Sequence, residues 1–183
     1  VADFESAAGR DRVLALAKDA DLVGESMAPG KIDELGLGYK ELSESHKDLV
    51  LTSVSPFGQY GPYRDWQSEE IVGWALSGYL YFGGDPNREP LMVHDHQADL
   101  HGGSHGALGA LSALWWARKT GHGQYVDVYS IEAKLTAHIW TTTQRTQMCV
   151  IQQRIGSDVV KCRDGWIHIM TMASTPDIFV LLG

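Results

Sequence analysis

A single carboxylate stands at the start of the most informative stretch of this chain. Asp99 comes directly before Leu100-His101-Gly102-Gly103, and the small and apolar residues that follow run on to Leu114-Trp115-Trp116 at helical spacing. A carboxylate at a helix N-terminus faces several backbone N–H groups that lack partners, and it stays ionised there. Such a group either caps the helix or acts as a nucleophile.

Capping is the commoner role, since Asp is a preferred N-cap residue and contributes about 1 kcal/mol there. The glycines after Asp99 also allow two interpretations. A helix face of glycine and alanine permits close packing against a neighbour, and it clears space beside Asp99 for a bulky acyl group. Both can hold together. The glycines concerned are Gly102, Gly103, Gly106 and Gly109.

Histidines crowd around Asp99 in the sequence, at His94, His96, His101 and His105. The i, i+4 spacing of His101 and His105 places both on one helix face, as in some metal sites. Glycines and a serine stand between them, rather than the glutamate of a zinc-binding HExxH motif. We therefore expect ordinary polar histidines and no bound metal.

Two adjacent carboxylates, Glu69 and Glu70, stand in front of an apolar stretch. Their charge complements the dipole of a helix that begins there, which is the commoner role for such residues. Two neighbouring carboxylates are also suited to general acid–base chemistry. The sequence leaves both roles open.

Phosphate binding has no strong motif in this chain, because neither GxGxxG nor a Walker A sequence is present. Lys31, Arg64 and Arg88 lie in predicted loops. A loop cation suits a phosphate group, although a solvated surface role is the commoner one for each of them.

Short apolar strands alternate with helices along most of the chain. The sequence predicts strands at 21–25, 48–54 and 124–130, the first of them buried. It predicts helices over 5–18, 33–37, 39–46, 69–82 and 132–145, besides the one that follows Asp99. Apolar strands that alternate with helices are typical of a parallel α/β sheet covered on both faces.

The pattern changes near the C-terminus. Residues 159–169 alternate in polarity around Asp164-Gly165, which predicts a β-hairpin with a tight turn. We expect this hairpin to begin a different structural unit.

Composition excludes several classes of partner. The chain has 183 residues, 44% of them hydrophobic, and a net charge of −8. Such a chain buries a real core, and its charge disfavours nucleic acid and anionic membranes, which need basic patches. Cys149 and Cys162 form no CxxC pair, and we recognise no signal peptide and no long apolar run. A reducing, cytoplasmic setting is the simplest interpretation.

Several short blocks occur in a recognisable order. Glu25-Ser26-Met27-Ala28-Pro29-Gly30 precedes Ser55-Pro56-Phe57-Gly58-Gln59-Tyr60-Gly61-Pro62-Tyr63, and Ala98-Asp99 precedes the stretch from Arg118 to Val128. Together they resemble the class III CoA-transferase family, which includes CaiB/BaiF-type proteins and formyl-CoA transferases. In that family the first two blocks read Glu-Asn-Phe-x-Pro-Gly and Gly-Phe-Gly-x-x-Gly-Pro. Order and spacing carry the resemblance, which covers nearly the whole chain.

By this resemblance, Asp99 matches the nucleophilic aspartate of the family. The implied reaction transfers coenzyme A between an acyl-CoA thioester and a free carboxylic acid through a covalent aspartyl intermediate. Coenzyme A enters as part of the substrate, and its expected contacts are Ser26, Met27, Lys31, Arg64 and Ser130. Ser26 and Met27 stand where the family usually has Asn and an aromatic residue, and Glu34 stands where a basic residue is common. These replacements weaken the expected binding of the nucleotide part of coenzyme A.

The resemblance also implies an architecture. It implies a Rossmann-like, CoA-binding large domain over residues 1–148, and over 149–183 a linker and the start of a small α+β domain. It implies a homodimer of interlocked chains. The family's first strand–helix–strand, which supplies part of the CoA pocket, is expected to be missing here.

Departures from the family pattern leave two further functions open. Related racemases use a histidine just before an aspartate as a second base, where this chain has Glu69-Glu70. An acyl-CoA racemase or isomerase would then use Glu69 or Glu70 together with Asp99. The third alternative is a non-catalytic remnant that folds and dimerises.

Overall fold

The computed structural model describes residues 3–138, 140–154 and 159–168. Its centre is a sheet of parallel strands, β1 (Leu22–Glu25), β2 (Val50–Ser55) and β3 (Tyr125–Tyr129), in the order β1-β2-β3. The middle strand, β2, is buried along almost its whole length. This parallel sheet confirms the predicted Rossmann-like α/β class.

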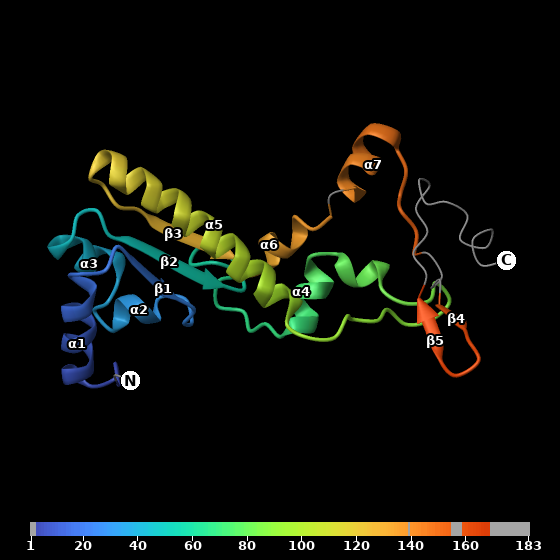
Figure 1. The fold of residues 1–183 in the computed structure, drawn as a ribbon, viewed down its shortest axis with the longest axis horizontal. Coiled ribbons are helices and arrows are strands. Elements are labelled where there is room, and N and C mark those ends of the chain that lie inside the picture. The colour runs from blue at the N-terminus through green and yellow to red at the C-terminus, as the bar shows by residue number, and fades with distance from the viewer. Residues whose placement is uncertain (1–2, 139, 155–158, 169–183) are drawn as a thin grey trace.

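Helices cover both faces of the sheet (Figure 1). On one face lie α1 (Ala7–Ala17), α2 (Lys31–Glu34) and α3 (Tyr39–Ser45). Their apolar residues join those of β2 in one core, made of Ala17, Ile32, Leu35, Leu37, Leu42, Leu49 and Leu51. The long helix α5 (Gln97–Thr120) runs along the other face, where its alanines 113 and 117 pack against Val50. Burial on both faces explains why β2 has the most strongly apolar strand sequence.

Small residues let α5 lie directly on the sheet. A Cβ atom at either Gly106 or Gly109 would come within 2.8 Å of a valine side chain of the sheet. A Cβ atom at Gly102 would overlap the side chain of Ser130, whereas one at Gly103 would meet open space. Close packing therefore explains three of these glycines, and cleared space explains Gly103.

The helix predicted over 69–82 is shorter in the structure. α4 (Glu70–Leu76) ends two residues before Gly78, which has φ 77°. A glycine adopts this left-handed conformation without the cost that a side chain imposes, and here it ends the α-helical path. A short 3-10 helix, η1 (Tyr79–Phe82), follows. The prediction of one continuous helix is wrong.

The prediction of one helix over 132–145 is also wrong, because this segment contains parts of two helices in the structure. α6 (Ser130–Leu135) and α7 (Thr141–Met148) are separate helices. The hydroxyl of Thr136 donates to the carbonyl of Ala133 at 2.7 Å, a local bond that competes with further helix. Residue 139, which lies between the two helices, is outside the described residues.

β1 is less buried than predicted. Its residues alternate between exposed and half-buried, and Leu22 is 38% exposed. In the described part of the chain, β1 pairs with β2 on one side and lies at the edge of the sheet. An edge strand is covered less fully than a central one, so the prediction of a buried strand is wrong for β1.

The C-terminal hairpin is confirmed. β4 (Val159–Lys161) pairs antiparallel with β5 (Trp166–His168), and the Cys162 N–H donates to the Gly165 carbonyl at 2.9 Å across the turn. The division of the chain at residue 148 stays a prediction. Among the described residues, no helix combines the length and the apolar character needed to cross a membrane.

The contact between α5 and α6 gives a stability prediction. Alanine favours a helix over glycine by about 1 kcal/mol. A Cβ atom at position 103 would meet open space, so Gly103→Ala should leave the free energy of unfolding unchanged or raise it slightly. Gly102→Ala should be less stable than Gly103→Ala by about 1–3 kcal/mol, because overpacking against Ser130 forces the helices apart. Urea unfolding of the two variants measures this difference, and equal stabilities would contradict the packing.

Candidate active site

Asp99 lies in the first turn of α5 but does not cap it. The N-cap residue is His96, and its side chain makes no capping hydrogen bond. The Asp99 side chain is 75% exposed, and its Oδ2 lies 3.6 Å from Nδ1 of His96. Among the described residues, no backbone amide donates to this carboxylate. The capping interpretation of Asp99 is therefore wrong.

A carboxylate from another helix takes the capping role instead. The backbone N–H of Ala98 donates to Glu70 Oε1 at 2.7 Å, and the indole N–H of Trp74 donates to the same oxygen at 2.8 Å. Glu70 lies in the first turn of α4, as the sequence predicted, but its carboxylate satisfies the start of α5. The first turn of a helix leaves several N–H groups unpaired, and Glu70 thus accepts one of them, that of Ala98. Asp99 does not have to accept this hydrogen bond.

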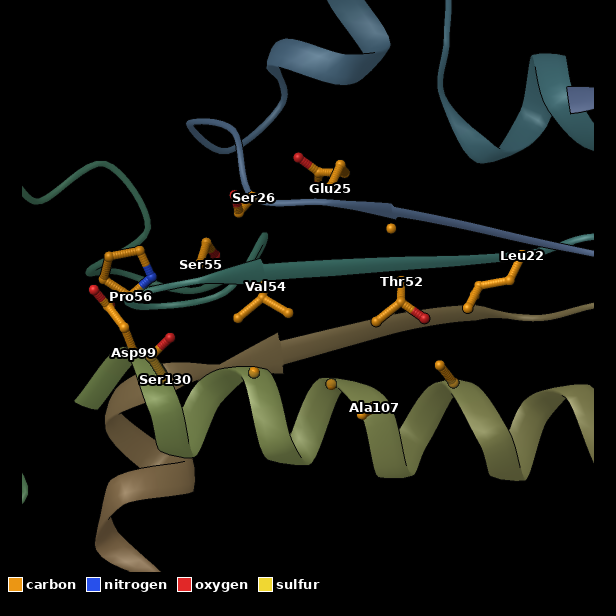
Figure 2. Close-up of a pocket in the computed structure, with 14 residues that line it drawn as sticks. Leu22, Glu25, Ser26, Thr52, Val54, Ser55, Pro56, Asp99, Ala107 and Ser130 are labelled. Atoms are coloured by element: carbon orange, nitrogen blue, oxygen red, sulfur yellow. The ribbon is translucent and has the colours of Figure 1, made fainter. Parts of the chain in front are cut away.

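A hollow of about 740 Å³ opens beside Asp99, between α5 and the sheet. Figure 2 shows Asp99 at one end of this hollow, next to Pro56 and Ser130. This end lies where β1 and β2 finish, and the carboxyl ends of parallel strands are the usual binding edge of such sheets. The other lining residues are Leu22, Gly24, Glu25, Ser26, Thr52, Val54, Ser55, Gly103, Gly106, Ala107 and Ala110.

Three buried hydroxyl groups, those of Thr52, Ser55 and Ser130, share this hollow with Asp99. Ser55, at the end of β2, is 2% exposed, and its Oγ has no hydrogen-bond partner among the described residues. Ser130, the first residue of α6, is 7% exposed. A buried hydroxyl without a partner is costly, so Ser55 is suited to donate to a polar ligand in the hollow. Ser55 opens one of the blocks that carry the family resemblance, but no sequence pattern singled it out as a site residue.

Asp99 also lines a second, smaller hollow of about 160 Å³, together with Glu69, Glu70 and His96. One ligand atom each from Glu70, His96 and Asp99 lies within 4.8 Å of the other two. In the part of the chain that the structure describes, these are the residues whose spacing would suit a cation. Oε1 of Glu70 already accepts two hydrogen bonds, whereas its buried Oε2 has no hydrogen-bond partner among the described residues.

The histidine pair that the sequence singled out has other partners. His101 Nδ1 lies 2.7 Å from the carbonyl of Gln97, and His105 Nδ1 lies 2.9 Å from the carbonyl of His101. The Nε2 atom of His105 lies 3.2 Å from the hydroxyl of Thr136. Both rings therefore contact their own helix, as expected for ordinary polar histidines.

The residues predicted to contact coenzyme A fall into two groups. Ser26 and Ser130 line the large hollow with Asp99. Met27 packs against the core under α1, and the Lys31 ammonium lies 3.5 Å from a Glu5 carboxylate oxygen. Arg64 donates to the carbonyl of Pro29 at 3.1 Å and lines a different hollow of about 390 Å³. The structure brings Ser26, Ser130 and Asp99 together, and it places Met27, Lys31 and Arg64 elsewhere.

Large aromatic rings suit an acyl pocket, and the chain offers Trp74, Tyr79, Trp115 and Trp116, but these four pack elsewhere. Trp74 is buried and packs edge-on against Tyr79, with ring centroids 5.3 Å apart. Trp115 and Trp116 line a hollow far along α5, with Trp115 60% exposed. None of these four rings lines either hollow at Asp99.

The sequence also missed a buried cation, Lys134 on α6. It is 3% exposed, and its ammonium lies 4.1 Å from the centroid of the Trp74 ring and 4.4 Å from that of Tyr79. Burial lowers the pKa of Lys134, and the negative charge of Glu70 opposes this shift. A lysine in a short amphipathic segment reads as a surface residue, so no pattern signalled its burial.

Known proteins share both the sequence and the fold. The sequence model of CoA-transferase family III matches residues 1–180. Succinyl-CoA:(R)-benzylsuccinate CoA-transferase subunit BbsE of Thauera aromatica is 35% identical over 175 residues, which cover 93% of this chain and 43% of that protein. Acetyl-CoA:oxalate CoA-transferase of Acetobacter aceti is 33% identical over 123 residues, covering 67% and 32%.

A solved structure agrees with these relatives. The crystal structure of a CaiB/BaiF family protein from Brucella suis superimposes with a TM-score of 0.85 at 26% identity, covering 90% of this chain and 46% of that one. The chain thus spans less than half the length of the proteins it matches. A match over nearly all of its residues shows that the chain belongs to CoA-transferase family III.

Proposed function

We propose that this chain carries the nucleophile of a class III CoA-transferase, and that the nucleophile is Asp99. The observation that supports this most directly is the position of its carboxylate. It lies exposed at the end of a 740 Å³ hollow, while Glu70 takes the capping role at the same helix start. An exposed carboxylate that does not cap its helix, beside space for a ligand, is suited to nucleophilic attack.

The proposed reaction splits CoA exchange into balanced steps. A carboxylate oxygen of Asp99 attacks the thioester carbonyl of an acyl-CoA, the C–S bond breaks, and a mixed anhydride and CoA thiolate form. The thiolate attacks the aspartyl carbonyl, which releases the first carboxylic acid and leaves an aspartyl-CoA thioester. The acceptor carboxylate then attacks the aspartyl carbonyl of this thioester, which releases the thiolate and forms a second mixed anhydride. The thiolate finally attacks the acceptor's acyl carbonyl, which gives the new acyl-CoA and restores Asp99.

The surroundings of Asp99 suit the charges that these steps develop. Each attack on a carbonyl creates an oxyanion, and hydroxyl and backbone N–H groups near the helix start are its natural donors. Ser55 and Ser130 are buried hydroxyl residues in the lining of the same hollow. We propose that coenzyme A contacts Ser26 and Ser130 in the hollow and extends beyond it to Met27, Lys31 and Arg64, with the two cations facing its phosphates. The proposed steps use no metal ion.

The substrates we propose are an acyl-CoA thioester and a free carboxylic acid, as a class rather than as named compounds. Asp99→Asn should lower the exchange of isotopic label between the two by about a thousandfold or more, because an amide is a poor nucleophile. Asp95→Asn is the matched control, since Asp95 is an exposed carboxylate just outside the same helix and should keep its activity. Full exchange by Asp99→Asn would contradict the assignment.

A racemase or isomerase is the second candidate, because Glu70 and Asp99 present oxygens within 4.8 Å of each other. Two bases of that kind would exchange the α-proton of an acyl-CoA with solvent. We expect CoA exchange without deuterium at the α-carbon when the reaction runs in D2O. Deuterium incorporation without CoA exchange would favour the racemase. Absence of both, together with no binding of CoA at millimolar concentration, would favour a non-catalytic remnant.

We propose that the protein works as a homodimer in the cytoplasm. The Thauera relative is named as a subunit, and α5 exposes Leu108, Leu111 and Trp115. Cys149 and Cys162 are unpaired thiols, as a reducing compartment favours. Size-exclusion chromatography with light scattering should give twice the chain mass, and a monomer at all concentrations would contradict the dimer.

A further inference from the structure

We propose that Lys134 is a positioning residue, whose buried ammonium holds the Glu70 carboxylate in place and thereby fixes the first turn of α5 at Asp99. The proposal uses the proposed function only for the catalytic role of Asp99. The contacts themselves run from α6 through α4 to α5 and belong to the fold.

The ammonium of Lys134 has an unusual environment. It is removed from water, and two aromatic rings of α4 and η1 lie within 4.4 Å of it. In the described part of the chain it forms no ion pair within 4.0 Å. Cation–π contacts are strongest when the cation is desolvated, but two rings alone do not replace the hydration of a full charge. A buried cation therefore requires a nearby negative charge.

Glu70 supplies that charge, and both Glu70 and Lys134 contact the indole ring of Trp74. Lys134 lies over the face of the Trp74 ring, and Glu70 accepts the N–H at the edge of the same ring at 2.8 Å. A cation on the ring face draws electron density from the indole and makes its N–H a stronger donor. The ammonium, the indole and the carboxylate thus stabilise one another.

The next contact leads to the nucleophile. The same oxygen of Glu70 accepts the Ala98 N–H at 2.7 Å, one residue before Asp99. A Cβ atom at Gly73 would come within 3.0 Å of the Ala98 Cβ, so α4 and α5 are in close contact here. A shift of the Glu70 carboxylate must therefore shift or release the start of α5.

Other charged groups lie near Glu70, but in other positions than Lys134. Glu70 and Asp99 are two carboxylates with oxygens within 4.8 Å, and like charges at that distance repel unless a cation compensates. His96 is 75% exposed and faces Asp99. His138 contacts Tyr79 with ring centroids 4.5 Å apart, and burial and the charge of Lys134 lower its pKa. Glu69 beside Glu70 adds further negative charge.

The test compares two replacements of Lys134. Lys134→Met keeps the length and packing of the side chain and removes its charge, whereas Lys134→Arg keeps the charge. The hydrogen-exchange rate of the Ala98 amide, followed by NMR, should rise about tenfold in Lys134→Met and stay near the wild-type value in Lys134→Arg. Lys119→Met is the matched control, because Lys119 lies 4.3 Å over the exposed Trp115 of the same helix without such a carboxylate network.

Trp74→Phe keeps a ring for the ammonium and removes the N–H donor, so it should also speed Ala98 exchange. It tests the same link if Lys134→Met does not fold. Unchanged exchange in folded Lys134→Met, or in Trp74→Phe, would overturn the proposal. Equal acceleration in the Met and Arg variants would also overturn it, because packing and not charge would then be responsible.

Enzyme kinetics separate this proposal from the proposed function. If both hold, Lys134→Met lowers kcat for CoA exchange about tenfold and leaves the KM for acyl-CoA unchanged, since the hollow keeps its lining. If the wild-type protein shows no CoA exchange, the proposed function fails, and the Ala98 measurement still decides the role of Lys134.

Discussion

The hydrogen bond from the Ala98 amide to the Glu70 carboxylate determines where the long helix α5 begins and what Asp99 is able to do. A helix start needs acceptors for its first N–H groups, and the N-cap residue of α5 supplies none from its side chain. Glu70 reaches across from α4 and supplies one. Asp99, which has the preferred chemistry for this task, is left with an exposed carboxylate. A side chain of one helix thus caps another helix and leaves the Asp99 carboxylate free of that role.

The sheet places this helix start beside a hollow. α5 lies close to β2 and β3 because its glycines present no side chains to them, and the axis of the helix carries its first turn to the carboxyl ends of the strands. At that edge Ser55 leaves β2 and Ser130 begins α6, so their hydroxyls gather near Asp99 (Figure 2). The arrangement follows the general rule that parallel sheets bind ligands at this edge.

Sequence patterns predicted the features that local rules determine. Apolar strands between helices indicated the parallel sheet, alternation around Asp164-Gly165 indicated the hairpin, and the small residues after Asp99 indicated a closely packed helix. The breaks at Gly78 and after Leu135 were missed, since one is a local backbone conformation and the other depends on a side-chain bond of Thr136. Periodicity alone registers neither of them.

The supporting network of the site could not be predicted from the sequence. Glu70 and Ala98 are 28 residues apart, and their contact depends on how α4 crosses α5. Lys134 reads as a surface lysine until α6 is placed against Trp74. Asp99 could be singled out because of its neighbours in sequence, whereas its freedom from capping depends on tertiary contacts. Long-range packing thus determined which of two plausible roles remained for the same residue.

In the proposed reaction, an acyl group is transferred from coenzyme A to the Asp99 carboxylate. The most direct measurement treats the protein with acyl-CoA and hydroxylamine and follows the peptide that contains Asp99 by mass spectrometry. We expect a hydroxamate at Asp99 that forms when acyl-CoA is present and does not form with hydroxylamine alone. An unmodified Asp99 in protein that is actively exchanging CoA, or a hydroxamate on another carboxylate, would contradict this account.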